Sequence, residues 1–193
     1  MAYIYSKFKN IIRRHSLIAP QDTIVTAVSG GVDSIVMLDL LYRLYQEEEY
    51  NFRLIVAHLN HSTRDGESDL DQALVENFCK NRKIEFKTKK VDVKKLACQT
   101  NKSFEMVARE VRYDFFEQIA ENGKIATGHT LDDHAETILL RILKGTGLNG
   151  LLGIAFQTDN IIHPIRFATK NELYDYATEH DLNYNEDRTN YEN

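Results

Sequence analysis

The chain has 193 residues, of which 42% are hydrophobic and 27% charged, and its net charge is −5. This composition is typical of a globular domain, and the acidic balance argues against a domain that binds nucleic acid over its whole surface. No apolar run approaches the roughly 20 residues of a membrane helix, and the N-terminus lacks a signal-peptide core. The two cysteines, Cys79 and Cys98, form no Cys-x-x-Cys motif. We therefore expect a cytoplasmic protein with no membrane contact.

Apolar residues recur alternately at helical spacing and in short buried runs along the whole chain. The pattern predicts helices over residues 3–17, 34–47, 68–82, 103–121, 130–144 and 171–180. It predicts strands over residues 23–28, 54–57, 84–91, 124–127 and 161–165. Strands that alternate with helices indicate an α/β domain with a Rossmann-like, doubly wound, parallel five-stranded sheet and helices on both faces. In such a fold, ligands bind at the carboxyl ends of the strands.

A glycine loop follows the first predicted strand and precedes a helix. Its two adjacent glycines allow the backbone to approach a ligand closely, and the N-terminus of the following helix attracts anions. The serines at its two ends add hydroxyl donors. The loop is neither a Walker loop nor a Gly-x-Gly-x-x-Gly turn, and it predicts a phosphate-binding site. It consists of Ser29, Gly30, Gly31, Val32, Asp33 and Ser34. The alternative is a tight turn in which Asp33 or Ser34 caps the helix.

Three carboxylates, Asp132, Asp133 and Glu136, fall within about one turn of the helix that follows the fourth strand. Part of this cluster suits a capping box with Thr130, because acidic residues stabilise the first turn of a helix. Three carboxylates beside two histidines exceed what capping needs. Such a cluster can hold an ammonium group or Mg²⁺, and it can accept a proton from an amine.

Glu105, Arg109 and Arg112 share one face of the helix over residues 103–121. One interpretation is a solvent-exposed Glu105–Arg109 ion pair of little energetic value. The other is a pair of arginines that bind phosphate or nucleic acid with planar guanidinium groups. The buried stripe beside them is expected to contain Phe104, Val107, Val111, Phe115 and Ile119.

His58 and His61 follow the second strand with the i, i+3 spacing of a metal pair. No cysteine or carboxylate stands at ligand spacing, so we expect no zinc site. The backbone near His58 is instead expected to border a bound nucleotide base. The glycines between Gly145 and Gly153 are either a helix exit or a flexible loop.

The Ser29–Ser34 string resembles the signature of the PP-loop ATP pyrophosphatases. Further motifs narrow the resemblance to the tRNA(Ile)-lysidine synthase family, over nearly the whole chain from about residue 21. These motifs lie at residues 57–61, 105–116, 127–138, 144–153, 163–166, 170–173 and 185–190. The resemblance implies an enzyme that uses ATP to adenylate the wobble cytidine of tRNA(Ile) with a CAU anticodon. The amine of L-lysine then displaces AMP to form lysidine.

The resemblance also implies roles for individual residues. Catalysis is assigned to Asp33, Arg112, Asp133 and Glu136, and ATP binding with Mg²⁺ to Ser29–Ser34 and His58. Substrate binding is assigned to Arg109, Arg112, Asp132, Asp133 and Glu136. The family pattern continues past Asn190, so residues 1–193 are expected to be the catalytic domain alone, without C-terminal tRNA-binding domains. A tRNA thiolase, another adenylating enzyme and a non-catalytic ATP sensor are the alternatives, and a homodimer is left open.

Overall fold

The computed structural model describes residues 3–62, 67–145, 147 and 151–185. Six strands form one sheet in the order β3-β2-β1-β4-β6-β5. These are β1 (Thr23–Ala27), β2 (Arg53–Asn60), β3 (Glu85–Lys90), β4 (Lys124–Ala126), β5 (Gln157–Thr158) and β6 (Ile161–Ile162). The helices are α1 (Tyr3–Arg14), α2 (Val32–Tyr45), α3 (Glu67–Arg82), α4 (Val93–Thr100), α5 (Phe104–Ala120), α6 (Leu131–Leu143) and α7 (Lys170–Glu179).

The predicted parallel α/β sheet is confirmed, with one change in strand number. The five predicted strands pair in parallel, and β5 adds a sixth, antiparallel strand beside β6. The fifth predicted strand is shorter than expected because it ends at Ile162, just before Pro164, which has no N–H to donate to a sheet. The short helix α4 was not predicted either.

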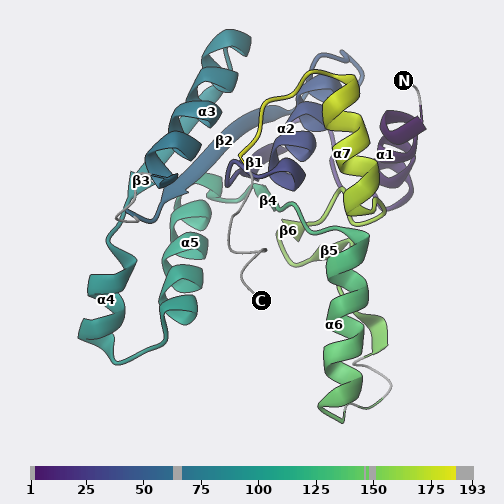
Figure 1. The fold of residues 1–193 in the computed structure, drawn as a ribbon. Coiled ribbons are helices and arrows are strands. Elements are labelled where there is room, and N and C mark those ends of the chain that lie inside the picture. The colour runs from purple at the N-terminus through teal and green to yellow at the C-terminus, as the bar shows by residue number, and fades with distance from the viewer. Residues whose placement is uncertain (1–2, 63–66, 146, 148–150, 186–193) are drawn as a thin grey trace.

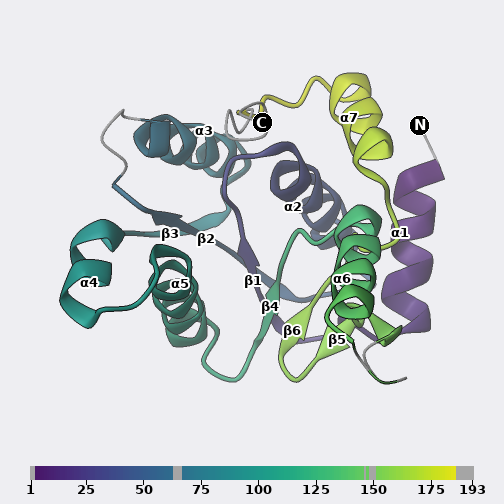
Figure 2. The same ribbon diagram turned by 60° about the horizontal axis from the view of Figure 1, so that its bottom comes forward.

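Side chains of the central strands alternate between the two faces of the sheet, as the period of two requires. Val25, Ile55 and Ile125 pack against α5 on one face. Ile24, Leu54 and Ala126 belong to the larger core on the other face, which is formed with α1, α2 and α7. Figure 2 shows α2 and α3 on one side of the sheet and α5 on the other. Apolar runs that alternate in this way account for a sheet covered on both faces.

Helix α6 lies apart from these layers and extends away from the sheet (Figure 1). Each of its residues is at least partly exposed, including Leu139, Leu140 and Leu143. Among the described residues, no helix has the length and apolar character needed to cross a membrane.

Candidate active site

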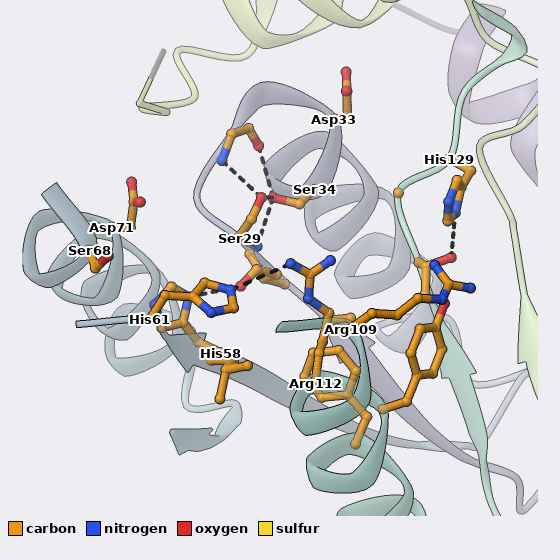
Figure 3. Close-up of a pocket in the computed structure, with 18 of the residues that line it drawn as sticks. Ser29, Asp33, Ser34, His58, His61, Ser68, Asp71, Arg109, Arg112 and His129 are labelled. Atoms are coloured by element: carbon orange, nitrogen blue, oxygen red, sulfur yellow. Dashed lines mark hydrogen bonds between the residues drawn. The ribbon is translucent and has the colours of Figure 1, made fainter. Parts of the chain in front are cut away.

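A cleft of about 500 Å³ opens at the carboxyl ends of β1, β2 and β4. The glycine loop forms one wall, and residues that follow β2 and β4 form the floor and the far side (Figure 3). Helix α5 contributes Arg109 and Arg112, whose side chains extend towards the loop. The predicted position of the site, at the ends of the first, second and fourth strands, is therefore the position of this cleft.

The hydroxyl of Ser34 holds the glycine loop in shape. Its oxygen accepts hydrogen bonds from the backbone N–H groups of Ser29 and Gly30, each at 3.2 Å. It donates to the carbonyl of Gly31 at 2.9 Å. Gly31 is the N-cap of α2, and no side chain of the loop caps the helix. The alternative in which Asp33 or Ser34 caps the helix is therefore wrong, and the first N–H groups of α2 lie beside the cleft.

The two glycines of the loop differ in backbone conformation and in the space around them. Gly30 has a φ of +111°, and a Cβ at this position would lie 2.9 Å from Oδ1 of Asp71. Gly31 is more open, since the nearest atom to a Cβ there is Oγ of Ser29 at 3.7 Å. Val32 points into the hydrophobic core and does not line the cleft. The loop is held from behind by Asn185, which donates its backbone N–H to Gly30 and its side-chain amide to Asp71.

Asp33 lies in the first turn of α2 and lines the cleft. Its Oδ1 atom is buried, and no group of the described residues donates a hydrogen bond to it. Burial raises the pKa of this carboxyl to about 6; Lys170 acts against the rise, and Asp133 and Asp132 add to it. A buried carboxylate without a partner is a group that a bound cation would stabilise.

Two histidines at the carboxyl end of β2 form part of the floor: His58 lies within the strand, which extends further than predicted, and His61 follows it. Nδ1 of His58 lies 2.8 Å from the carbonyl of Val28, so it carries the proton, because a carbonyl only accepts. Burial lowers the pKa of both rings, and that of His61 reaches about 4, with Arg112 and His58 contributing. Both rings are therefore neutral near pH 7. Nε2 of His61 lies 3.4 Å from the guanidinium of Arg112 and helps to orient it.

Helix α5 directs its two arginines, but not Glu105, to the cleft. Arg109 and Arg112 both line the cleft, and the guanidinium of Arg109 lies over the ring of Tyr113 at 4.8 Å. Glu105 is exposed and lies outside the set that lines the cleft. The predicted buried stripe is wrong at Phe104, the first residue of α5, which is 42% exposed.

The three carboxylates of α6 separate in the structure. Oδ2 of Asp133 accepts hydrogen bonds from N and Oγ1 of Thr130, at 2.7 and 2.8 Å, which completes the predicted capping box. Asp133 also lines the cleft, and among the described residues it is the one that α6 contributes to the lining. Asp132 accepts from the backbone N–H of Lys170 at the start of α7, and Glu136 is exposed.

Several cleft residues have no role assigned to them from the sequence. Asp71 comes from the N-terminal part of α3, where no sequence pattern marks it. Thr127 and His129 follow β4, and Oγ1 of Thr127 lies 2.9 Å from Nδ1 of His129. The glycine run is described only in part: Gly145 and Gly153 have positive φ, and Gly150 lies outside the described residues.

A family model for the PP-loop domain matches residues 2–193. The chain belongs to the PP-loop family. As a PP-loop domain, it is 46% identical over 187 residues to the tRNA(Ile)-lysidine synthase of Clostridium tetani, covering 95% of this chain and 40% of the relative. It is 40% identical over 194 residues to the enzyme of the same name from Clostridioides difficile, covering 98% of this chain and 42% of the relative. The chain thus spans about 40% of the length of these curated relatives.

Solved structures share this PP-loop fold at lower identity. A U34-tRNA thiolase from Methanococcus maripaludis is 22% identical with a TM-score of 0.74, over 98% of this chain and 67% of the thiolase chain. An NH₃-dependent NAD synthetase from Campylobacter jejuni is 18% identical with a TM-score of 0.61, over 93% of this chain and 72% of the synthetase. At these identities the likeness concerns the fold.

Proposed function

We propose that the chain is the catalytic domain of an ATP-dependent ligase that forms lysidine. It adenylates the wobble cytidine of tRNA(Ile) with a CAU anticodon and then joins L-lysine to it, with AMP and pyrophosphate as the other products. The observation that carries the proposal is the glycine loop, which is tied by Ser34 and faces two arginines across the cleft. The identity of 46% to a named lysidine synthase supports this reaction among those of the PP-loop family.

The glycine loop binds the phosphates of ATP in this proposal. The N–H groups of the first turn of α2, which have no partner within the helix, and the open face of Gly31 offer an anion site, to which Ser29 adds a hydroxyl. The region of His58 lies in the same cleft and borders the base. ATP is then held along the carboxyl ends of β1 and β2, with its α-phosphate towards the arginines.

Arg112 and Arg109 stabilise negative charge on the phosphates. Displacement at the α-phosphorus leaves pyrophosphate with additional charge, and guanidinium groups bind such oxygens in a planar, two-point manner. Arg112 is oriented by His61 before any ligand arrives, which reduces the reorganisation needed during the reaction. The same two arginines also face the place where the tRNA nucleotide must enter.

The carboxylates of Asp33 and of the start of α6 bind cations in this proposal. Asp33 and Asp133 are cleft residues that fit Mg²⁺, because Oδ1 of Asp33 is buried with no hydrogen-bond donor in the described part of the chain and magnesium prefers carboxylate oxygens. When bound, the ion would neutralise phosphate charge. The ammonium group of lysine is assigned to the acidic residues at the start of α6, of which Asp133 lines the cleft. Asp132 and Glu136 are exposed outside the lining, where a free amino acid has access.

The test is the reaction itself, measured with the complete protein, ATP, L-lysine and tRNA(Ile). Lysine-dependent modification of the tRNA, with AMP formed in equal amount, is the expected result. AMP formation that ignores lysine but requires a sulfur donor would replace this proposal by the thiolase alternative. Neither cysteine favours that alternative, since Cys79 is buried and Cys98 lies on α4, and neither lines the cleft.

A further inference from the structure

A row of three hydrogen-bonding side chains runs from the cleft into the sheet beside β4 and β6. Oγ1 of Thr127 lies 2.9 Å from Nδ1 of His129 and 2.7 Å from Nδ1 of His163. Thr127 and His163 are 8% and 7% exposed, and the two imidazole rings meet edge to face with centroids 4.7 Å apart. A backbone hydrogen bond from the N–H of Thr127 to the carbonyl of Ile162 also holds Thr127 in position at the ends of β4 and β6.

Counting protons restricts what this row can do. The hydroxyl of Thr127 has one proton and therefore donates to only one of the two Nδ1 atoms. At least one imidazole must consequently donate its own Nδ1–H to the hydroxyl oxygen. If Thr127 donates to His163, then His129 is the ring that carries its proton on Nδ1.

Both rings are neutral near pH 7, so each carries a single ring proton. Burial lowers the pKa of His163 to about 4, with His129 and Arg166 contributing. Burial also lowers the pKa of His129; Asp133 acts against this, and Arg109 and Arg112 add to it. The position of one proton on each ring therefore decides which nitrogens donate and which accept.

The surroundings of His129 favour an unprotonated Nε2. Figure 3 shows its ring held by the hydrogen bond at Nδ1, which leaves Nε2, on the opposite side of the ring, for the cleft. The cations Arg109 and Arg112 line the same cleft as this ring, and an imidazole lone pair directed into the cleft is more favourable beside them than an N–H. Asp133 is the carboxylate that would favour an N–H, but its Oδ2 already accepts two hydrogen bonds from Thr130.

The geometry points to Thr127 and His163 as positioning residues that keep the proton of His129 on Nδ1, so that Nε2 faces the cleft as a proton acceptor. Its use rests on the proposed function. In the second step, the lysine nitrogen bonds to C2 of the cytidine and the bond from C2 to the oxygen of AMP breaks. The proton that the amine loses passes to Nε2 of His129. The positioning itself holds in the protein without substrates.

The decisive measurement is a long-range ¹H–¹⁵N spectrum of the complete protein with ¹⁵N-labelled histidine, because protonated and unprotonated ring nitrogens differ widely in ¹⁵N shift. In the wild type and in Thr127→Ser, we expect a protonated Nδ1 and an unprotonated Nε2 on His129. Thr127→Val removes the acceptor, and His163→Phe keeps a ring but frees the hydroxyl proton for His129. Both changes should move the proton to Nε2. His15→Gln, which removes an exposed histidine elsewhere, is the control.

Activity gives a second readout. Thr127→Val and His163→Phe should lower kcat of lysine transfer by at least about tenfold, because a misplaced base loses part of the roughly 10²–10⁴-fold that general base catalysis contributes. The KM for ATP should stay within about twofold, since the loop is untouched, and Thr127→Ser should retain activity. A wild-type spectrum with the proton of His129 on Nε2 overturns the inference, as do identical spectra for Thr127→Ser and Thr127→Val. The expected spectra without any lysine-dependent product would uphold the proton position and refute the ligase reaction instead.

Discussion

Replacing Asp33 by asparagine should stabilise the folded protein at neutral pH while it abolishes formation of AMP. Asp33 lines the cleft with a buried Oδ1 that has no donor among the described residues. Its pKa rises from 3.8 to about 6, mainly through burial, so the folded state favours the protonated form. An uncharged amide of the same shape avoids the burial of this charge.

The magnitude follows from the shift. A rise of about 2 units, at about 1.4 kcal/mol per unit, corresponds to an upper value of about 3 kcal/mol. Because the pKa is raised in the folded state, the wild type has its full stability at low pH, where the carboxyl is protonated in both the folded and the unfolded state. The part of the free energy of unfolding that depends on this protonated carboxyl is lost as the pH rises from about 4 through about 6. The asparagine variant has no such carboxyl and keeps its stability. The difference in the free energy of unfolding between the variant and the wild type therefore grows over the same pH window and is complete near pH 7.

Urea unfolding at pH 5 and pH 7.5, without ATP or metal ions, measures the effect. The free energy of unfolding of Asp33→Asn should exceed that of the wild type by up to about 3 kcal/mol at pH 7.5 and by about half as much at pH 5. Asp114→Asn, on the exposed side of α5, is the matched control and should change stability little at either pH. An Asp33→Asn protein that is less stable than the wild type at pH 7.5, or a difference that ignores pH, would refute the account of this carboxyl.

Three further outcomes are expected. Gly123→Ala should lower the free energy of unfolding by about 1–3 kcal/mol in urea titrations, because its Cβ would meet the backbone oxygens of Thr23 and Ala120; unchanged stability would contradict the packing described here. Asp133→Asn should raise the KM for lysine more than the KM for ATP in steady-state kinetics, with a smaller effect for the exposed Glu136→Gln; equal factors for both substrates would argue against lysine binding. Residues 1–193, with a net charge of −5, should bind tRNA at least about tenfold more weakly than the complete protein in gel-shift titrations near 0.15 M salt. Equal affinities would place the main tRNA contacts on this domain.

The sequence predicts the site where two local signals agree. The β-branched run before Ser29 and the glycine string after it specify a strand, a loop and a helix, and the structure has β1, the loop and α2 there. Contacts between residues that are far apart in the sequence have no local pattern from which they could be predicted. Asn185 bonds to Asp71 across 114 positions, and His163 contacts Thr127 across 36. No periodicity connects residues at such separations.

Two elements and the exposure of one residue were also not predicted from the sequence, and each has a physical reason. Strand β5 consists of Gln157 and Thr158, too short a segment for an alternating pattern. Helix α4 has eight residues and buries Val93 alone, so it is too short for its apolar period to repeat. Phe104 fits the helical period of α5, but burial also depends on how far the sheet extends, which the period does not contain.

The central claim is that the cleft at the glycine loop converts ATP to AMP for lysine transfer to tRNA(Ile). It is tested most directly by measuring AMP release with the wild type and Gly31→Val, with lysine and tRNA each present or omitted. Gly31 is open towards the cleft, so a valine there obstructs the phosphate site rather than the fold. We expect lysidine, with one AMP released for each lysidine formed, only when lysine and tRNA are both present, and none with Gly31→Val at an unchanged melting temperature. Wild-type turnover by Gly31→Val, or AMP release with no lysine incorporated into the tRNA, would contradict the account.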